Sequence, residues 1–241
     1  MLDWLRQDPR SPPYVVIGQM RLPIVIRRLA RARRMTLRLS PDGREVRISI
    51  PQWGRTAEAV AFARSRSDWL AARIAAIPPP EPVRAGGTLP YRGESAVITH
   101  LSGMARTPRF ADGTIALGGA AESIERRLKR WLQAEARRLA EEDLAQYCAR
   151  ADRPVPPLAL SSAHRRWGSC APDGAIRINW RLIMAPDFVR RSVVAHEVAH
   201  LVHFDHSPRF HRLLAEIFEG DVTAANAWLK RFGLTLYQPF G

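Results

Sequence analysis

Five of the seven histidines of this 241-residue chain lie within sixteen positions, in the stretch HEVAHLVHFDHSPRFH at 196–211. In an α-helix, side chains four residues apart share a face, so His196 and His200 can bind one metal ion together. Glu197 projects roughly 100° around the helix from His196, where its carboxylate can reach a water on that metal without binding the ion. This HExxH spacing predicts a zinc site with Glu197 as the catalytic acid/base.

A catalytic zinc site needs a third protein ligand beside an open position for water. On a continuing helix, His203 would lie about 10.5 Å from His196, so the two would approach an ion from nearly opposite sides. His206 directly precedes Ser207-Pro208, a pair typical of the N-cap and first residue of another helix. A bend there would turn His206 back over the first two histidines. We therefore favour His206 as the third ligand; the alternatives are His203, Glu216 and Glu219.

The residues around the motif predict short strands alternating with helices. Alternating apolar residues and Asp-Gly turns predict strands within 14–50, 89–119 and 158–179. Capping residues and apolar spacing predict helices from Thr56 to about Ile77, from Ala121 to Arg150, and from Pro186 through the HExxH motif. The protein is thus expected to be α+β.

The stretch PPPEP at 78–82 is the strongest linker candidate in the chain. It suggests three sections: a β-hairpin region plus helix at 1–82, a small β section at 83–120, and a domain with the metal motif at 121–241. The long helix expected at 121–150 would brace both halves.

Composition limits the class of protein. The hydrophobic fraction is 46%, that of an ordinary globular protein, and no run approaches the roughly 18 apolar residues of a membrane span. The start of the chain lacks the apolar core of a signal peptide. Two cysteines, Cys148 and Cys170, give neither a disulfide framework nor a four-cysteine zinc site. We expect a cytoplasmic protein with no membrane partner.

The net charge is +14, and 35 of the 37 basic residues are arginine. Arginine binds phosphate oxygens bidentately, so this excess predicts at most weak, non-specific nucleic-acid binding. A bias that replaces lysine by arginine on a solvated surface explains the same count. Because the arginines are spread along the chain without a recognisable nucleic-acid module, the bias is the favoured explanation.

The run RRWGSCAPDGAIRINWRLIMAPDFVRRSVVAHEVAHLVHFDHSPRF at 165–210 resembles the core of the YgjP-like metallopeptidases. The shared pattern is WGSC, a strand ending in Asn, a Pro-started helix with HExxH, and a third His before Ser and a buried aromatic. Upstream, the basic hairpin and LPYRGESAVI are similar to the amino-terminal half of that family. The chain departs from the pattern at His164-Arg165, in place of Lys-Ser, and at His211, in place of tryptophan.

This resemblance implies a β-rich amino-terminal half followed by a compact zincin-like domain, SprT-like in style, with a small sheet and an HExxH active-site helix. It implies that Zn²⁺ is held by His196, His200 and His206, with Glu197 as the catalytic acid/base.

The predicted function is that of a zinc-dependent hydrolase, a metallopeptidase that attacks peptide or protein substrates with a zinc-activated water. An extended substrate could pair with the strand at 175–179 as an exposed edge. Arg166 and Asn179 are the candidate substrate-binding residues. The alternative is a nucleic-acid-associated basic protein whose zincin domain acts on bound proteins or is inactive. A purely structural metal site is disfavoured, because such a site has no need of Glu197.

Overall fold

A computed structural model describes residues 12–40, 43–76, 82–164 and 166–240 of the protein. The chain divides into two compact units, Met1–Pro79 and Pro80–Gly241, which are taken one at a time below. Six α-helices and three small sheets make up the described residues, so the predicted α+β class is confirmed. The predicted linker at 78–82 lies almost wholly outside them.

The amino-terminal unit contains a four-stranded sheet of order β1-β2-β4-β3. Its strands are β1 (Tyr14–Ile17), β2 (Met20–Leu29), β3 (Thr36–Leu39) and β4 (Val46–Pro51). β3 and β4 form the predicted antiparallel hairpin, whose turn residues 41–42 are outside the described residues. β2 runs parallel to β4 and antiparallel to β1.

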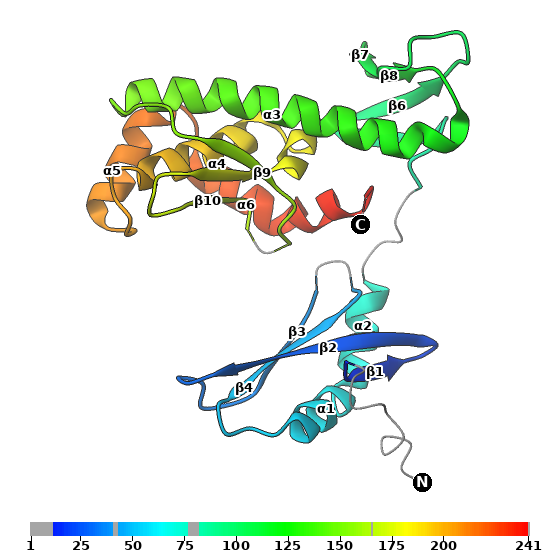
Figure 1. Ribbon diagram of the computed structural model, residues 1–241, viewed down its shortest axis with the longest axis vertical. Helices are drawn as coiled ribbons and strands as arrows, with labels where there is room; N and C mark the ends of the chain where they lie inside the picture. Colours follow the sequence, from blue (N-terminus) through cyan, green and yellow to red (C-terminus); the bar gives the residue numbers. More distant parts are fainter. Residues whose placement is uncertain (1–11, 41–42, 77–81, 165, 241) are drawn as a thin grey trace. The chain divides into compact units, whose positions relative to one another are not determined.

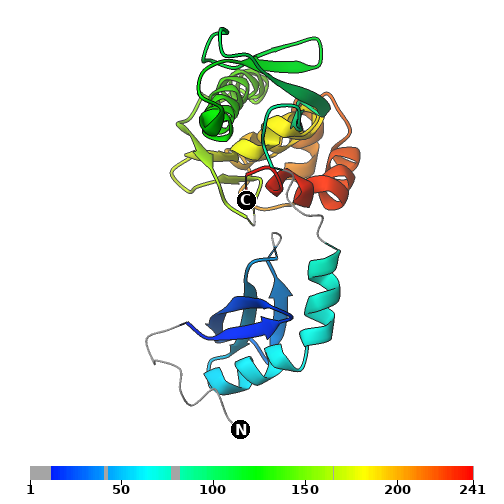
Figure 2. The same ribbon diagram turned by 90° about the vertical axis from the view of Figure 1, so that its right-hand side faces the viewer.

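Two helices, α1 (Thr56–Arg64) and α2 (Ser67–Ala75), follow this sheet. The sequence predicted one continuous helix here, but Ser65 and Arg66 separate the two. Alternate strand residues such as Ile24 and Ile48 pack with Ala59, Ala63 and Leu70 of the helices in one core. Figure 2 shows both helices on the same side of the sheet. Among the residues of this unit that the structure describes, no helix covers the other face of the sheet.

The carboxy-terminal unit begins with a second sheet, of order β5-β6-β8-β7. Its strands are β5 (Thr88–Tyr91), β6 (Glu94–His100), β7 (Arg109–Ala111) and β8 (Thr114–Leu117). The strand order and the parallel central pair repeat those of the first sheet. No internal repeat is evident in the sequence, because the strands share a pattern of pairing rather than residues.

The helix α3 (Ile124–Arg150) joins this sheet to the metal-site region in one continuous core. Apolar residues of β5 to β8 pack on its first turns, and α4 (Asp187–His200) packs on its later turns (Figure 1). The sequence predicted that residues 83–120 and 121–241 form separate sections. In the structure they form one unit, because the sheet of β5 to β8 has no hydrophobic core of its own and shares one core with α3.

A three-stranded sheet of order β10-β11-β9 lies beside α4. Its strands are β9 (Leu158–Ser161), β10 (Gly168–Cys170) and β11 (Ile176–Asn179). The prediction that the strand at 175–179 is an exposed edge is wrong: β11 is central, antiparallel to β10 and parallel to β9. The edge beside α4 is β10.

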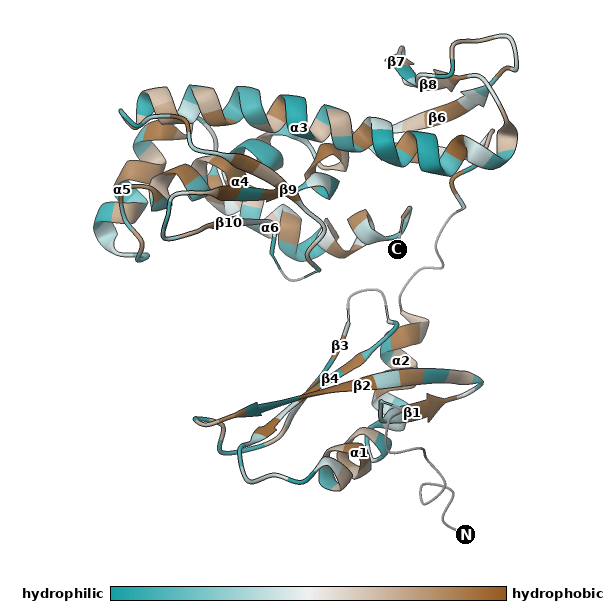
Figure 3. Ribbon diagram, viewed as in Figure 1, coloured by the Kyte–Doolittle hydropathy of each residue, from teal (hydrophilic) through white to brown (hydrophobic). Residues whose placement is uncertain are grey.

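The unit is completed by the 3-10 helix η3 (Trp180–Met184), by α5 (Pro208–Ile217), α6 (Val222–Phe232) and the 3-10 helix η4 (Gly233–Tyr237). Hydrophobic residues concentrate where α4 meets the sheet of β9, β10 and β11, whereas α3 alternates hydrophobic and hydrophilic turns (Figure 3).

Within the described residues, no helix combines the length and apolar character needed to cross a membrane.

Candidate metal centre

The helix that carries the HExxH motif is held at its start by ion pairs. Pro186 precedes the first turn of α4, and Asp187 lies in that turn near the positive end of the helix dipole. Asp187 pairs with Arg190 at 2.5 Å, and Arg190 also pairs with Asp143 of α3 at 2.8 Å. Arg190 and Asp143 are both buried, so removing either would leave an uncompensated charge inside the protein. This arrangement fixes α4 against α3.

The structure brings His196, His200 and His206 together. Nε2 of His196 lies 3.2 Å from Nε2 of His200 and 3.2 Å from Nε2 of His206. All three candidate ligand nitrogens lie within 4.8 Å of one another, and this is the one such cluster among the described residues. His206 reaches the other two because α4 ends at His200 and α5 begins at Pro208, with Ser207 as N-cap. This is the predicted bend.

These nitrogens fit a tetrahedral zinc ion. Zinc–nitrogen bonds of 2.0–2.1 Å at the tetrahedral angle place two ligand nitrogens about 3.3 Å apart. Two of the three separations are 3.2 Å and agree with that value. Three converging imidazole nitrogens would also satisfy the protein part of a catalytic site, which leaves its fourth position to water or substrate.

Two further contacts orient the histidine rings. Nδ1 of His200 lies 3.0 Å from the backbone carbonyl oxygen of His203, so a proton on Nδ1 leaves Nε2 free as a ligand. Phe210 is fully buried, and its ring centroid lies 4.9, 4.6 and 4.8 Å from those of His196, His200 and His206. One aromatic ring thus packs on all three candidate ligands. The sequence marked Phe210 only as a buried aromatic.

Glu197 is buried against the edge strand β10. Its side chain is 6% exposed, and its carboxylate accepts a hydrogen bond from the backbone N–H of Cys170. A methyl group on Gly168 would come within 2.7 Å of Glu197 Cγ and 2.8 Å of its Cδ. The glycine in WGSC therefore makes room for this carboxylate. The sequence alone does not show which side chain packs against this glycine.

Burial sets the protonation of this site. Desolvation raises the pKa of Glu197 to about 7, although the Cys170 N–H and the charge of Arg166 lower it. Such a value suits a group that exchanges protons near neutral pH. Burial, followed by the charges of His200, His206 and His211, lowers the pKa of His196 to about 4. His196 is therefore neutral at pH 7, as a metal ligand must be.

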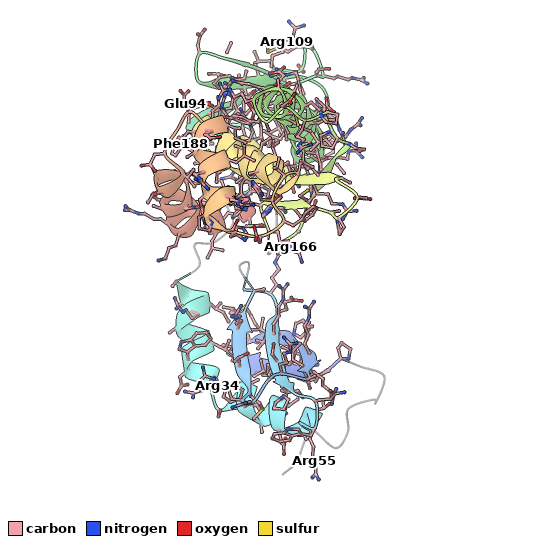
Figure 4. All side chains as sticks on the ribbon, turned by 90° about the vertical axis from the view of Figure 1, so that its left-hand side faces the viewer. Arg34, Arg55, Glu94, Arg109, Arg166 and Phe188 are labelled. Atoms are coloured by element: carbon pink, nitrogen blue, oxygen red, sulfur yellow. The ribbon has the colours of Figure 1, made fainter. Side chains whose placement is uncertain are left out.

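The two candidate substrate residues lie in different surroundings. Arg166 is exposed, points away from the core of its unit (Figure 4), and is close enough to Glu197 to affect its pKa. Asn179 is 1% exposed. Its side-chain amide donates to the backbone oxygens of Ala163 and Arg166, at 2.8 and 3.3 Å. This geometry favours a structural role for Asn179, which holds the loop that leads into β10.

The alternative third ligands lie elsewhere. Glu219 pairs with Arg150 and Arg191, and Glu216 is exposed on α5. His203 follows the end of α4 and contributes its backbone carbonyl, as described above. The His211 ring centroid is 6.5 Å from that of His206.

Cys170 contributes its backbone rather than its thiol. Burial, with the charges of Glu197 and Asp173, raises the pKa of the thiol. The thiol lies 3.6 Å from the carbonyl oxygen of Ala171. A thiol with a raised pKa is a poor nucleophile and a poor metal ligand at neutral pH.

An HExxH helix, a third histidine from the following turn and an edge strand beside the glutamate define a zincin-like domain. The chain belongs to the YgjP-like family: the family model described as YgjP-like, metallopeptidase domain, matches residues 33–232. Neither a curated protein nor a solved structure gave a match to the chain. Membership of a metallopeptidase family supports a metal-dependent hydrolase.

Proposed function

We propose that the protein is a zinc peptidase in which His196, His200 and His206 hold the ion and Glu197 transfers protons. The convergence of the three Nε2 atoms carries this proposal, because two of their separations match those of a tetrahedral zinc site. When bound, zinc supplies a Lewis acid for the substrate carbonyl and lowers the pKa of water to about 7.

The role of Glu197 follows from its position and its pKa. With a pKa of about 7, its carboxylate can take a proton from the attacking water and later pass that proton to the leaving amine. The Cys170 N–H fixes one side of the carboxylate. Gly168 leaves the space that the side chain occupies.

The edge of β10 that does not pair with β11 is the proposed site for an extended peptide. On either side of β10, the carbonyl of Trp167 accepts a hydrogen bond from the N–H of Asn179, and the N–H of Ala171 donates to the carbonyl of Ala175, so both groups face the β11 side. Because backbone groups alternate in direction along a strand, those of Gly168 and Cys170 face the other edge, toward Glu197. A substrate strand added there would place its carbonyl beside the catalytic residues. Arg166, at the start of this strand, is the proposed contact for a substrate carbonyl or carboxylate.

A peptide screen tests the proposal. The zinc-loaded protein and a Glu197→Gln variant, also zinc-loaded, are incubated with peptides from a digested proteome, and new amino termini are identified by mass spectrometry. We expect new termini with the parent protein alone, because glutamine keeps the shape of glutamate but cannot accept the proton. Equal cleavage by the variant would exclude the mechanism.

A further inference from the structure

The amino-terminal unit carries most of the positive charge of the protein. Residues 1–79 hold 15 arginines, no lysine and six acidic residues, a net charge of +9. Residues 80–241 form a unit about twice as long, which holds a net charge of only +5. A bias of arginine over lysine changes the kind of cation but not the balance of charges. The excess in this unit therefore needs another explanation.

The charge is concentrated in one segment. Residues 9–41 contain eight arginines and no acidic residue. Within them, the arginine segment (residues 27–38) holds six, all exposed, at the end of β2, in the connection to β3 and in β3 itself. These are Arg27, Arg28, Arg31, Arg33, Arg34 and Arg38. Six like charges without an acidic partner in the segment repel one another, so they favour an anionic partner.

An exposed tryptophan lies beside this segment. Trp53 is 80% exposed, in the loop between β4 and α1. The strand register pairs Leu29 with Pro51, and Nη2 of Arg28 lies 3.0 Å from Oγ1 of Thr56. Residues 51–56 are thus side by side with the arginine segment. Arg55 adds another exposed cation to this loop; it and Arg34 of the segment are labelled in Figure 4.

We propose that the arginine segment and Trp53 bind single-stranded nucleic acid. Guanidinium groups match phosphate oxygens, and an exposed indole provides a stacking surface for an unpaired base. A duplex keeps its bases stacked and would not use the tryptophan. These residues belong to the amino-terminal unit and the histidine cluster to the carboxy-terminal unit, so the inference does not depend on the proposed peptidase.

Fluorescence anisotropy of the 241-residue chain tests this inference. The probes are a labelled mixed-sequence RNA of about 20 nucleotides and its duplex, titrated at salt concentrations from about 50 to 200 mM. The first variant combines Arg31→Ser, Arg33→Ser and Arg34→Ser. Its matched control combines Arg126→Ser, Arg130→Ser and Arg153→Ser, which removes the same charge from exposed positions of the other unit.

We expect the segment variant to bind the single strand at least ~10-fold more weakly and to lower the slope of log affinity against log salt by about 2. The control should change affinity less than ~2-fold. Trp53→Ala should weaken single-strand binding by roughly 5- to 100-fold and leave duplex binding unchanged. Because Trp53 and the three arginines are exposed, these variants should fold as the parent does. Removing zinc with a chelator should have no effect on RNA binding.

Three outcomes would overturn the inference. Equal losses in the two triple variants would mean that only bulk charge attracts RNA. Absence of measurable RNA binding at the lowest salt concentration would exclude nucleic acid as the partner of this surface. Binding to phosphatidylserine vesicles without binding to RNA, if the segment variant abolishes it, would assign the surface to an anionic membrane instead.

Discussion

Gly168 and Glu197 lie so close that no side chain fits between them: a methyl group on residue 168 would be 2.7 Å from Glu197 Cγ. Such a contact forces one of the two residues to move. The backbone of Gly168 belongs to a strand paired with β11, whereas Glu197 can change rotamer. The glutamate is therefore the residue that would be displaced.

Gly168→Ala should accordingly reduce peptide hydrolysis by about 100-fold, the effect of misplacing a catalytic group by about 1 Å. Zinc content should stay the same, because the three atoms nearest to the new methyl group all belong to Glu197 and none to a histidine. Turnover and metal content are measured on the same samples. Gly103→Ala is the control, since a methyl group there meets no atom within 4 Å. An active Gly168→Ala protein would show that Glu197 tolerates displacement.

The three-histidine site predicts about one zinc ion per chain. His206→Ala should lower the zinc content sharply, because two ligands bind zinc far less tightly than three. His203→Ala is a matched control from the same segment: its backbone carbonyl, which faces Nδ1 of His200, is kept. Metal analysis after dialysis against a weak chelator gives the comparison. The reverse order of losses would make His203 the ligand.

The HExxH part of the site could be predicted from the sequence because it is local. His196 and His200 share a face through helical spacing alone, and Ser207-Pro208 marks the start of the next helix. His206 follows from the bend between them. The hairpin of β3 and β4 and the long helix α3 were predictable for the same reason.

What the sequence could not predict depends on contacts between distant residues. Strand order is one case: β11 is central because β9 and β10 both pair with it, which its own residues do not reveal. Asn179 is another case. The residue type does not reveal whether an Asn at a strand end contacts substrate or, as here, donates a hydrogen bond to the backbone of Ala163. The position of Phe210 among three rings likewise requires the packing of α5 on α4.

Phe210→Leu should weaken zinc binding by about 10-fold, because residues that orient metal ligands contribute at this level. The free energy of unfolding should fall by about 1–2 kcal/mol for the lost buried atoms. Phe218→Leu is the matched control: Phe218 is 4% exposed and packs near Tyr147 rather than the histidines. It should destabilise the protein similarly and leave zinc affinity unchanged. Competition with a zinc-binding dye measures the affinity, and equal weakening in both variants would contradict a specific role for Phe210.

The last prediction concerns the metal-free protein and the raised pKa of Glu197. The folded protein keeps a proton on this group up to about pH 7, whereas its ordinary pKa is 4.5. Between these values the folded state binds more protons than the unfolded state, so the free energy of unfolding falls as pH rises through this window. The stability that Glu197 contributes is full below pH 4.5 and is lost above 7. Glutamine at this position does not titrate, so the Glu197→Gln variant lacks this dependence of the free energy of unfolding on pH.

Glu197→Gln should thus leave the stability of the chelator-treated protein unchanged near pH 4.5 and raise it by about 3 kcal/mol above pH 7, from a shift of 7 minus 4.5 at 1.36 kcal/mol per pKa unit. Denaturant unfolding of both proteins across this range gives the difference. The lowered pKa of His196 makes stability fall as pH drops from 6.5 to about 4, but it does so in both proteins and cancels. Glu216→Gln, at an exposed position of α5, is the control substitution. If the difference in free energy of unfolding between the parent and Glu197→Gln did not change with pH, the carboxylate of Glu197 would be solvated rather than buried against β10.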